Sequence, residues 1–464
     1  MSGRESPFKG LESFEDSDHD ARLFFGRERE REIVVANLLA SKLTVLYGDT
    51  GVGKSSVLRA GVARDLRALP EPLAVVVFDE WRDDPAGRLQ ARVAEATGAE
   101  PQSRLVDTLE LGAAMVGGEV VVILDGFEEE FLYHGLDAGP DSFFDQFSEA
   151  VTRPGLRASF LVAIREDALA KLDRFKSRVP NVFGNYLRLP HLDRTAAREA
   201  IFGPVDRYNE SADVPVEIES ALVEAVLDQV TAGKVELGQA GRGGVDAGGS
   251  RAGIEAPYLQ LVMERLWQAE SLAGSKALRL ETFDRLGGAE QIVRDHLDRA
   301  LEALEPEQRD VAAAVFNHLV TPSGAKIAHD ASDLAGYVGV PESDVAPVLS
   351  ALAAQRILRS VPGVRGSDQP RYEIYHDILA DPVLAWRTRH ESEREVGRVH
   401  VEAAKRHRRL LLVAAGAVVL AGAMALLAVF AFAQRSEVDA QARKAHARAF
   451  ERNVPAGDLS RCGR

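Results

Sequence analysis

Eight residues, Gly48-Asp49-Thr50-Gly51-Val52-Gly53-Lys54-Ser55, match the pattern G-x-x-x-x-G-K-[ST] and constrain the fold more than any other part of the chain. A match of this kind arises by chance in about one or two of a hundred chains of this length. An apolar run, Leu43–Tyr47, ends directly before the pattern, and a helix-like stretch, Ser55–Leu66, begins within it. A strand, a Gly-rich loop and a helix in this order predict a P-loop; the alternative is a Gly-rich turn before an ordinary helix.

The chemistry of a P-loop follows from its backbone and from two side chains. Backbone N–H groups and the N-terminus of the helix surround the phosphates. We expect Lys54 to neutralise the β- and γ-phosphates and the Ser55 hydroxyl to ligate Mg²⁺. The chain is therefore predicted to bind a purine nucleoside triphosphate with Mg²⁺, with ATP exchanging for ADP. The predicted nucleotide contacts in this segment are Gly48, Asp49, Thr50, Gly51, Val52, Gly53, Lys54, Ser55 and Ser56.

A second motif, Val120–Asp125, is an apolar run that ends in a carboxylate. In a parallel sheet such a strand ends beside the P-loop, so we expect Asp125 to hold the Mg²⁺ shell. Two of the glutamates that follow, Glu128 and Glu129, are candidates to polarise the attacking water. The alternative for the glutamate triplet of residues 128–130 is the solvated start of a helix. Lys54, Asp125, Glu128 and Glu129 are thus predicted catalytic residues.

Apolar runs of strand length alternate with amphipathic segments from residue 42 to about residue 192. This alternation predicts a doubly wound parallel α/β sheet of the RecA/ASCE type, with ligands at the carboxyl ends of its strands. A chain of 464 residues is too long for one hydrophobic core, so more than one domain is expected. We assign residues 1–200 to this P-loop NTPase domain. The predicted strands are Leu43–Tyr47, Leu73–Phe78, Val120–Leu124, Phe160–Ile164 and Tyr186–Leu189.

The pattern becomes helical in residues 201–300, which we predict to be a helical domain with a Gly-rich surface loop at 233–253. Residues 301–390 are predicted to be a winged-helix domain. Its expected parts are a helix at Pro306–Leu319, a helix-turn-helix at Ala331–Gln355, and a hairpin of Ile357–Val361 with Tyr372–Tyr375.

Charge argues against a nucleic-acid partner. The net charge is −15, and the candidate recognition helix carries Glu342 and Asp344 without a basic cluster, whereas duplex affinity comes from lysine and arginine. A structural or regulatory role is therefore expected for the winged-helix domain. The single cysteine, Cys462, excludes a disulfide framework and a cysteine-based zinc site. Residues 16–20 hold three aspartates and a histidine without regular ligand spacing, so we interpret them as a solvated acidic linker and not as a metal loop.

Residues 410–433 are 24 residues without a charge, about 36 Å of helix, which is enough to cross a hydrocarbon core. A charged juxtamembrane helix, 391–409, is predicted before this span and a short polar tail, 434–464, after it. Four basic residues at 405–409 against Arg435 alone favour the N-terminal side in the cytoplasm, where ATP is available. We therefore expect a single-pass protein of the cell inner membrane.

Further motifs give the chain a resemblance to a known family. It resembles the STAND class of P-loop NTPases, which includes NACHT and AP-ATPase signalling switches, and most closely the novel STAND branch. The motifs that carry the resemblance are Pro7–Phe14, Phe24–Glu28, Asp125–Glu129, Phe160–Asp167, Ala200–Pro204, Ala256–Trp267 and Tyr372–Asp377. Gly126 stands where many members have glutamine.

The resemblance implies further site residues. Gly26, Arg27 and Glu28 become candidate contacts to the base and ribose, and Arg165 matches the arginine that reads the γ-phosphate. His376 matches the winged-helix histidine that reaches the β-phosphate of ADP. The alternatives that do not depend on the family are simpler. Arg165 would cap a buried strand and pair with a neighbouring carboxylate, and His376 would bond to a backbone carbonyl.

The family also implies a function: a switch that is closed with ADP, self-associates with ATP, hydrolyses ATP slowly and acts on an effector protein that the sequence does not identify. Two other readings stay open. One is a continuously cycling, membrane-associated ATPase of the remodelling or motor type, and the other is a scaffold in which the nucleotide is structural.

Overall fold

The computed structural model describes residues 5–49, 51–135, 139, 141–231, 253–321, 326–361, 370–375 and 379–452. Thr50, His376, the final residues of the tail and all but the last residue of the loop 233–253 lie outside the described residues, so the predictions made for them stay predictions. The chain divides into two compact units, Met1–Thr388 and Arg389–Arg464, and each is described by itself.

Five parallel strands form the central sheet of the first unit, in the order β2-β3-β4-β1-β5. All five strands predicted from the sequence are confirmed, to within two residues at each end. Apart from β5, the strands are almost wholly buried, as expected for a parallel sheet covered on both faces. The bounds are β1 (Leu43–Gly48), β2 (Leu73–Phe78), β3 (Glu119–Leu124), β4 (Ala158–Arg165) and β5 (Tyr186–Arg188).

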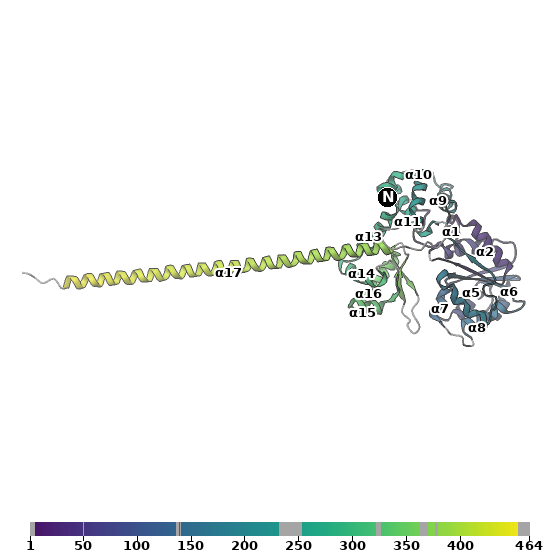
Figure 1. Cartoon of the computed structure of the whole chain (residues 1–464), viewed down its shortest axis with the longest axis horizontal. Coiled ribbons are helices and arrows are strands. Elements are labelled where there is room, and N and C mark those ends of the chain that lie inside the picture. Colours follow the sequence, from purple (N-terminus) through teal and green to yellow (C-terminus); the bar gives the residue numbers. More distant parts are fainter. Residues whose placement is uncertain are drawn as a thin grey trace, which may run out of the picture. The chain divides into compact units, whose positions relative to one another are not determined.

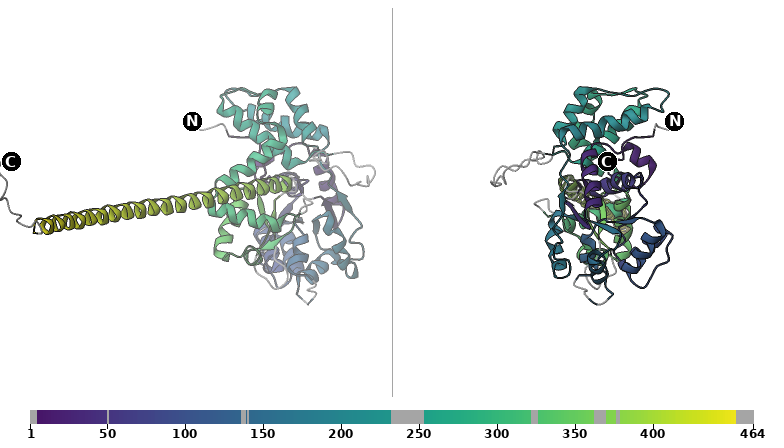
Figure 2. Two further views of the ribbon diagram at one scale, coloured as in Figure 1. Left: turned by 60° about the vertical axis from the view of Figure 1, so that its left-hand side comes forward. Right: turned by 90° about the vertical axis from the view of Figure 1, so that its right-hand side faces the viewer.

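Helices cover both faces of this sheet (Figures 1 and 2). Alternate strand residues belong to the hydrophobic clusters on opposite faces. Val122 belongs to the cluster on one face and Ile123 to the cluster on the other. The first face carries α5 (Pro85–Thr97), α6 (Leu105–Val116), α8 (Phe143–Thr152) and the 3₁₀ segment η2 (Glu166–Ser177). The second carries α2 (Glu28–Ala40) and a helix made of α3 (Lys54–Ser56), the π-helical turn η1 (Val57–Val62) and α4 (Ala63–Arg67). Two short helices, α1 (Asp18–Leu23) and α7 (Glu128–Tyr133), flank them.

Polar side chains fix where several helices begin. The Asp84 carboxylate accepts a hydrogen bond from the Gly87 N–H at 3.1 Å, and Pro85 occupies the first turn of α5. Asp193 caps α9 (Arg194–Asn209) in the same way through the Ala196 N–H at 2.8 Å. Each cap satisfies a backbone donor that the helix itself leaves unpaired, so these helix starts are encoded locally.

Residues 194–302 are largely helical, as predicted. They form α9 (Arg194–Asn209), α10 (Ser220–Gln229), α11 (Ala256–Leu272), α12 (Leu280–Arg285) and α13 (Gly288–Glu302). A two-stranded parallel pair, β6 (Glu217–Ile218) with β7 (Ala277–Leu278), joins them. The hydrophobic cluster of this region continues into residues 306–386, so the predicted boundary at residue 300 does not divide the core.

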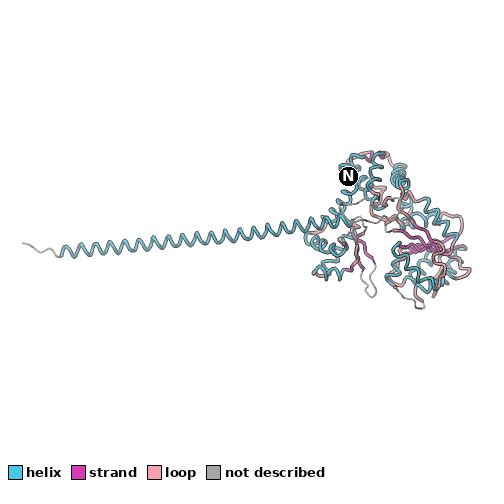
Figure 3. Tube along the Cα trace, in the orientation of Figure 1, coloured by secondary structure: helices cyan, strands magenta, loops and turns pink. Residues whose placement is uncertain are grey.

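Three helices and an antiparallel sheet follow. The elements are α14 (Pro306–Leu319), β8 (His329–Asp330), α15 (Ala331–Val338), α16 (Glu342–Ala354), β9 (Leu358–Val361) and β10 (Arg371–Ile374). The strands pair in the order β8-β10-β9, apart from the central sheet (Figure 3). The helix predicted at 306–319 is confirmed residue for residue, and the predicted hairpin is the β9–β10 pair.

The helix α17 (Ala380–Arg452) starts in the first unit and supplies the described part of the second. Within it, residues Ala414–Ala445 are long and apolar enough to cross a membrane by length and composition. This stretch overlaps the predicted span 410–433. Its large apolar side chains are exposed, Leu426 at 73 % and Phe432 at 76 %, whereas a core helix of a soluble domain buries such side chains.

Candidate functional site

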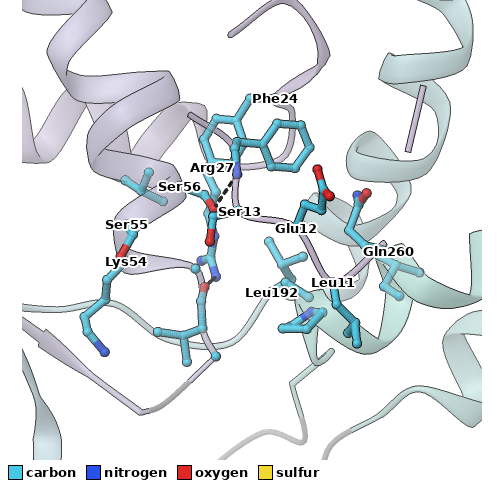
Figure 4. A pocket seen from close by; sticks show the side chains of 18 of the residues that line it. Leu11, Glu12, Ser13, Phe24, Arg27, Lys54, Ser55, Ser56, Leu192 and Gln260 are labelled. Atoms are coloured by element: carbon cyan, nitrogen blue, oxygen red, sulfur yellow. Dashed lines mark hydrogen bonds between the residues drawn. The ribbon is translucent and has the colours of Figure 1, made fainter. Parts of the chain in front are cut away.

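A pocket of about 270 Å³ lies in the first unit, at the carboxyl ends of β1 and β3. Its walls come from the N-terminal segment, the P-loop, the helical region and the β9–β10 sheet. Lys54, Ser55 and Ser56 lie on one side of it, and Leu11 and Gln260 lie on the other (Figure 4). The predicted site residues that line the pocket are Arg27, Gly51, Val52, Gly53, Lys54, Ser55, Ser56, Asp125, Glu128 and Arg165.

Five predicted site residues do not line it: Gly26, Glu28, Gly48, Asp49 and Glu129. Their predicted roles stay predictions.

The backbone of the P-loop depends on two glycines. Gly51 has φ 81° and Gly53 has φ 92°, in the left-handed region that side chains with a Cβ rarely adopt. A Cβ added at Gly53 would have no atom within 4 Å, so glycine is needed there for its backbone conformation and not for lack of space. The turn brings the N-terminus of α3 into the pocket. There the Lys54 ammonium donates to the carbonyls of Gly48 at 2.8 Å and Asp49 at 3.0 Å.

Asp125 follows β3 and is 4 % exposed. Its Oδ1 accepts a hydrogen bond from the Ser55 hydroxyl at 3.1 Å, and its Oδ2 accepts one from the Arg59 guanidinium at 3.2 Å. Burial raises the pKa of this carboxyl, while Arg59 and Ser55 oppose the rise. A hydroxyl and a carboxylate oxygen side by side are hard oxygen donors, so the residues present fit Mg²⁺.

Arg59 is a site residue that sequence reasoning missed. Besides Asp125, its guanidinium pairs with Asp79 at 2.5 Å and with Glu15 at 2.8 Å. The available signal was its spacing: Arg59 lies four residues after Ser55, and residues four apart in a helix share a face. The carboxylate partners, however, come from three other segments of the chain, and their approach is a tertiary feature.

Trp81 fixes the backbone beneath Asp125. Its indole N–H donates to the Asp125 carbonyl at 2.7 Å, and the Asp125 N–H donates to the Phe78 carbonyl at 2.8 Å. The indole packs edge-on against Phe127 and Phe143. Since Trp81 is 1 % exposed, this bond holds the end of β3 from inside the core.

The glutamates after β3 are held in a partly buried cluster. Glu128 accepts a hydrogen bond from the Arg165 N–H at 3.2 Å, and burial raises its pKa. Burial raises the pKa of Glu129 to about 7, and the charges of Glu128 and Asp125 add to the rise. The triplet is the start of α7, as the alternative reading expects, but Glu130 is 1 % exposed, so this helix start is not solvated.

Arg165 forms the carboxylate pair expected without the family, and its role at the γ-phosphate stays a prediction. It lines the pocket, and its guanidinium also forms two hydrogen bonds with the Asp167 carboxylate, at 2.8 and 3.0 Å. Burial acts to lower the pKa of Arg165, but the Asp167 carboxylate outweighs it and raises the pKa, and it also orients the planar guanidinium.

Arg27 contacts the protein backbone through its guanidinium. Its Nη2 donates to the carbonyl of Val52 in the P-loop at 2.9 Å and to the carbonyl of Pro190 after β5 at 2.8 Å. Its Nη1 pairs with Glu30 at 3.1 Å. Arg27 is 3 % exposed, and burial lowers its pKa. It therefore ties three segments together behind the phosphate loop.

Gly26 and Glu28 form the turn that presents Arg27. Gly26 has φ 82°, and a Cβ there would lie 2.2 Å from the Ala196 carbonyl oxygen. The Glu28 carboxylate accepts a hydrogen bond from the Gly26 N–H at 3.0 Å. These two residues thus shape the backbone and leave the pocket wall to Phe25 and Arg27.

The far wall is largely apolar. Leu11, Phe24 and Leu192 line it with Gln260, whose amide oxygen accepts a hydrogen bond from the Lys9 N–H at 3.1 Å. Tyr375 closes the wall and donates to the Leu11 carbonyl at 3.0 Å.

The acidic stretch 16–20 is exposed from Asp16 to His19, as the interpretation of a solvated segment expects, but its last residue is buried. Asp20 is 3 % exposed, pairs with Lys9 at 3.0 Å and accepts a hydrogen bond from the Glu15 N–H at 2.7 Å. Asp16 pairs with Arg67 at 2.6 Å. Within the described residues, no group of three or more His, Cys, Asp or Glu is placed to hold a metal ion.

Comparison with known proteins decides the family. The sequence profile of Novel STAND NTPase 1 matches residues 7–409. The chain belongs to this novel STAND family. The resemblance inferred from the motifs is thereby confirmed, and the protein is a nucleotide-binding P-loop ATPase of the STAND type. No curated protein sequence matches the novel STAND chain significantly.

Solved structures with a similar fold share little sequence with this novel STAND chain. The ORC2 protein of Aeropyrum pernix, solved as ADPNP-ADP complexes, is 15 % identical over 80 % of this chain and 95 % of its own, with a TM-score of 0.43. The ORC1 protein of the same organism, solved in complex with DNA, is 16 % identical over 79 % and 96 %, with a TM-score of 0.41. The Walker-type ATPase PABY2304 of Pyrococcus abyssi is 15 % identical over 80 % and 97 %, with a TM-score of 0.39.

Proposed function

We propose that this protein is a membrane-anchored signalling switch that changes conformation or self-associates when ADP is exchanged for ATP. The observation that carries the proposal is the composition of the pocket wall. Lys54 and Ser55 come from the P-loop, Gln260 from the helical region, and Arg359 and Tyr375 from the β9–β10 sheet. A nucleotide bound there touches all three parts, and a ligand shifts a conformational equilibrium only through such differential contacts.

The proposed roles at the phosphates follow from the geometry. The ammonium of Lys54 and the N–H groups at the start of α3 bind the β- and γ-phosphates, and Ser55 with Asp125 holds Mg²⁺. When bound, Mg²⁺ neutralises charge on the phosphate oxygens. Glu128 lines the pocket and orients the attacking water, which favours it over Glu129 as the base.

Slow hydrolysis is the expected regime. The Glu128 carboxylate already accepts a hydrogen bond from the Arg165 N–H, and the Arg165 guanidinium is paired with Asp167. The Glu128 carboxylate keeps lone pairs for a water, because the N–H occupies only one of its oxygens, but Arg165 must release Asp167 before its Nε and Nη2 can bind a γ-phosphate. A barrier of this kind suits a switch that resets after signalling, and it argues against continuous turnover.

We also propose that residues 301–390 are a winged-helix domain with a regulatory role. Support comes from the element order α14-β8-α15-α16-β9-β10, in which three helices accompany a three-stranded antiparallel sheet. The first turn of α16 carries Glu342 and Asp344, so a protein surface suits this helix better than the phosphates of DNA.

The proposed location is the cell inner membrane. The exposed apolar stretch of α17 supports a single span at 410–433, with the ATPase on the cytoplasmic side. Clustering of switches in the membrane would present the signal to an effector protein.

The test uses the full chain, purified in detergent and reconstituted into lipid nanodiscs. The protein is denatured and the released nucleotide is identified, and ATP turnover and ATP-driven association are then measured. We expect bound ADP, turnover far below one per second, and association that Lys54→Ala abolishes. The exposed Arg29→Ala, which lies outside the pocket, is the matched control. Turnover of tens per second without an activator would refute the switch, and association unchanged by Lys54→Ala would favour a scaffold.

A further inference from the structure

Arg359 stands on β9 and lines the same pocket as Lys54 and Arg165, although 194 residues or more separate it from either in sequence. It faces Glu373, its register partner on β10. The Arg359 Nε donates to the Glu373 Oε1 at 2.7 Å, and its Nη2 donates to the same oxygen. A single carboxylate oxygen thus takes both bonds, and Nη1 makes no hydrogen bond to any residue in the part of the chain that the structure describes.

The charges around this pair belong to the phosphate end of the pocket. The positive charge of Arg359 opposes the rise in the pKa of Glu129, and Glu373 contributes to the raised pKa of Arg165. Arg359 is 27 % exposed and Glu373 is 10 % exposed, so the guanidinium is reachable while its carboxylate partner is shielded. A partly exposed cation in a partly desolvated pocket is a strong anion-binding group.

Neighbouring arginines do not share this position. Arg356 pairs with the Tyr375 hydroxyl at 3.2 Å and with Glu12 at 3.6 Å, and Arg371 donates to the Ala328 carbonyl. Neither residue lines the pocket. Among the described arginines of residues 301–388, Arg359 is the one that the pocket wall includes.

We propose that Arg359 binds the terminal phosphate of the nucleotide, and that Glu373 competes with that phosphate for the guanidinium. With ADP, Arg359 keeps its bonds to Glu373. With ATP, the γ-phosphate attracts the guanidinium, because it carries more charge and extends further toward this end of the pocket. The β9–β10 sheet then moves with the nucleotide state. This inference rests on the proposed function and adds to it the residue that discriminates ATP from ADP on the side opposite the P-loop.

The experiment measures the affinities of the full chain in nanodiscs for ATP and for ADP, in Mg²⁺, by calorimetric titration. Four variants are compared with the wild type: Arg359→Ala, Arg359→Lys, Glu373→Gln and, as the control on the same sheet, Arg371→Ala. We expect Arg359→Ala to weaken ATP binding about tenfold or more and ADP binding by much less, as for loss of one charge-assisted bond. Arg359→Lys should lose less, since it keeps the charge. Glu373→Gln should tighten ATP binding several-fold, and Arg371→Ala should change neither affinity.

Two results would overturn the inference. One is an ATP affinity unchanged in Arg359→Ala while Lys54→Ala loses binding, and the other is an equal loss of ATP and ADP affinity in Arg359→Ala. If the alanine variant is unstable, the ATP and ADP affinities of Arg359→Lys are compared instead, after its fold has been checked by circular dichroism. A failure of the proposed function is distinguishable from a failure of this inference, because in that case the wild type itself shows no nucleotide-driven association.

Discussion

Arg27→Ala should destabilise the protein even when no nucleotide is present. The family resemblance made Arg27 a contact to the nucleotide, but its guanidinium donates to the carbonyls of Val52 and Pro190 and pairs with Glu30. The substitution therefore removes the tie between the N-terminal segment, the P-loop and the segment after β5.

The magnitude follows from the burial of each partner. A hydrogen bond from a charged donor contributes about 1.5–3 kcal/mol when it is buried. The bond to Val52 is of this kind, since Val52 is 1 % exposed, and the deletion also leaves the Val52 carbonyl without its partner. Pro190 is exposed and Glu30 is half-buried, so the contacts of Arg27 to these two residues contribute less to the free energy of unfolding. The expected loss in free energy of unfolding is about 3–4 kcal/mol.

Urea unfolding of the nucleotide-free protein measures this loss, with the fluorescence of Trp81 in the central core as a reporter. With a slope of about 2–3 kcal/mol per molar urea for a domain of this size, the midpoint should fall by about 1–2 M. Arg27→Lys should recover part of the loss, and the exposed Arg29→Ala on the same helix should lose nothing. The reasoning is refuted if Arg27→Ala keeps the wild-type midpoint and only weakens nucleotide binding, because the arginine would then act on the ligand.

Two further predictions use the same unfolding assay. Arg59→Ala should lower the free energy of unfolding in EDTA by about 2–3 kcal/mol, because Asp125 alone among its three carboxylate partners is buried. Mg²⁺ should recover part of this loss. An equal loss in EDTA and in Mg²⁺ would contradict the assignment. Burial raises the pKa of Glu129 from 4.5 to about 7, in surroundings that include Glu128, Asp125, Asp79 and Arg359. Between these two pH values the folded state holds a proton that the unfolded state has lost. The free energy of unfolding should therefore fall as the pH rises from about 4.5 to 7. Glu129→Gln should remove this fall and be more stable than the wild type at pH 8 by up to about 3 kcal/mol, whereas parallel pH profiles would show that Glu129 titrates normally.

Sequence patterns predicted the parts of the fold whose causes are local. A buried parallel strand reads as a short apolar run, so all five strands of the central sheet were found within two residues. The helix at Pro306–Leu319 also has a local cause, since a proline and a capping glutamate mark its start. The burial of Asp20 at the end of the acidic stretch was missed because composition does not reveal that Lys9 lies against it.

The candidate site divides in the same way. The P-loop and Asp125 are determined by the sequence itself, since glycine conformations, a helix start and a strand end are properties of neighbouring residues. Arg59, Trp81, Arg359 and Tyr375 were decided only by the tertiary structure. Tyr375 bonds to the Leu11 carbonyl across 364 residues, and no local pattern records such a contact. The sequence thus determines where phosphates bind, and the packing of distant segments decides which side chains surround them.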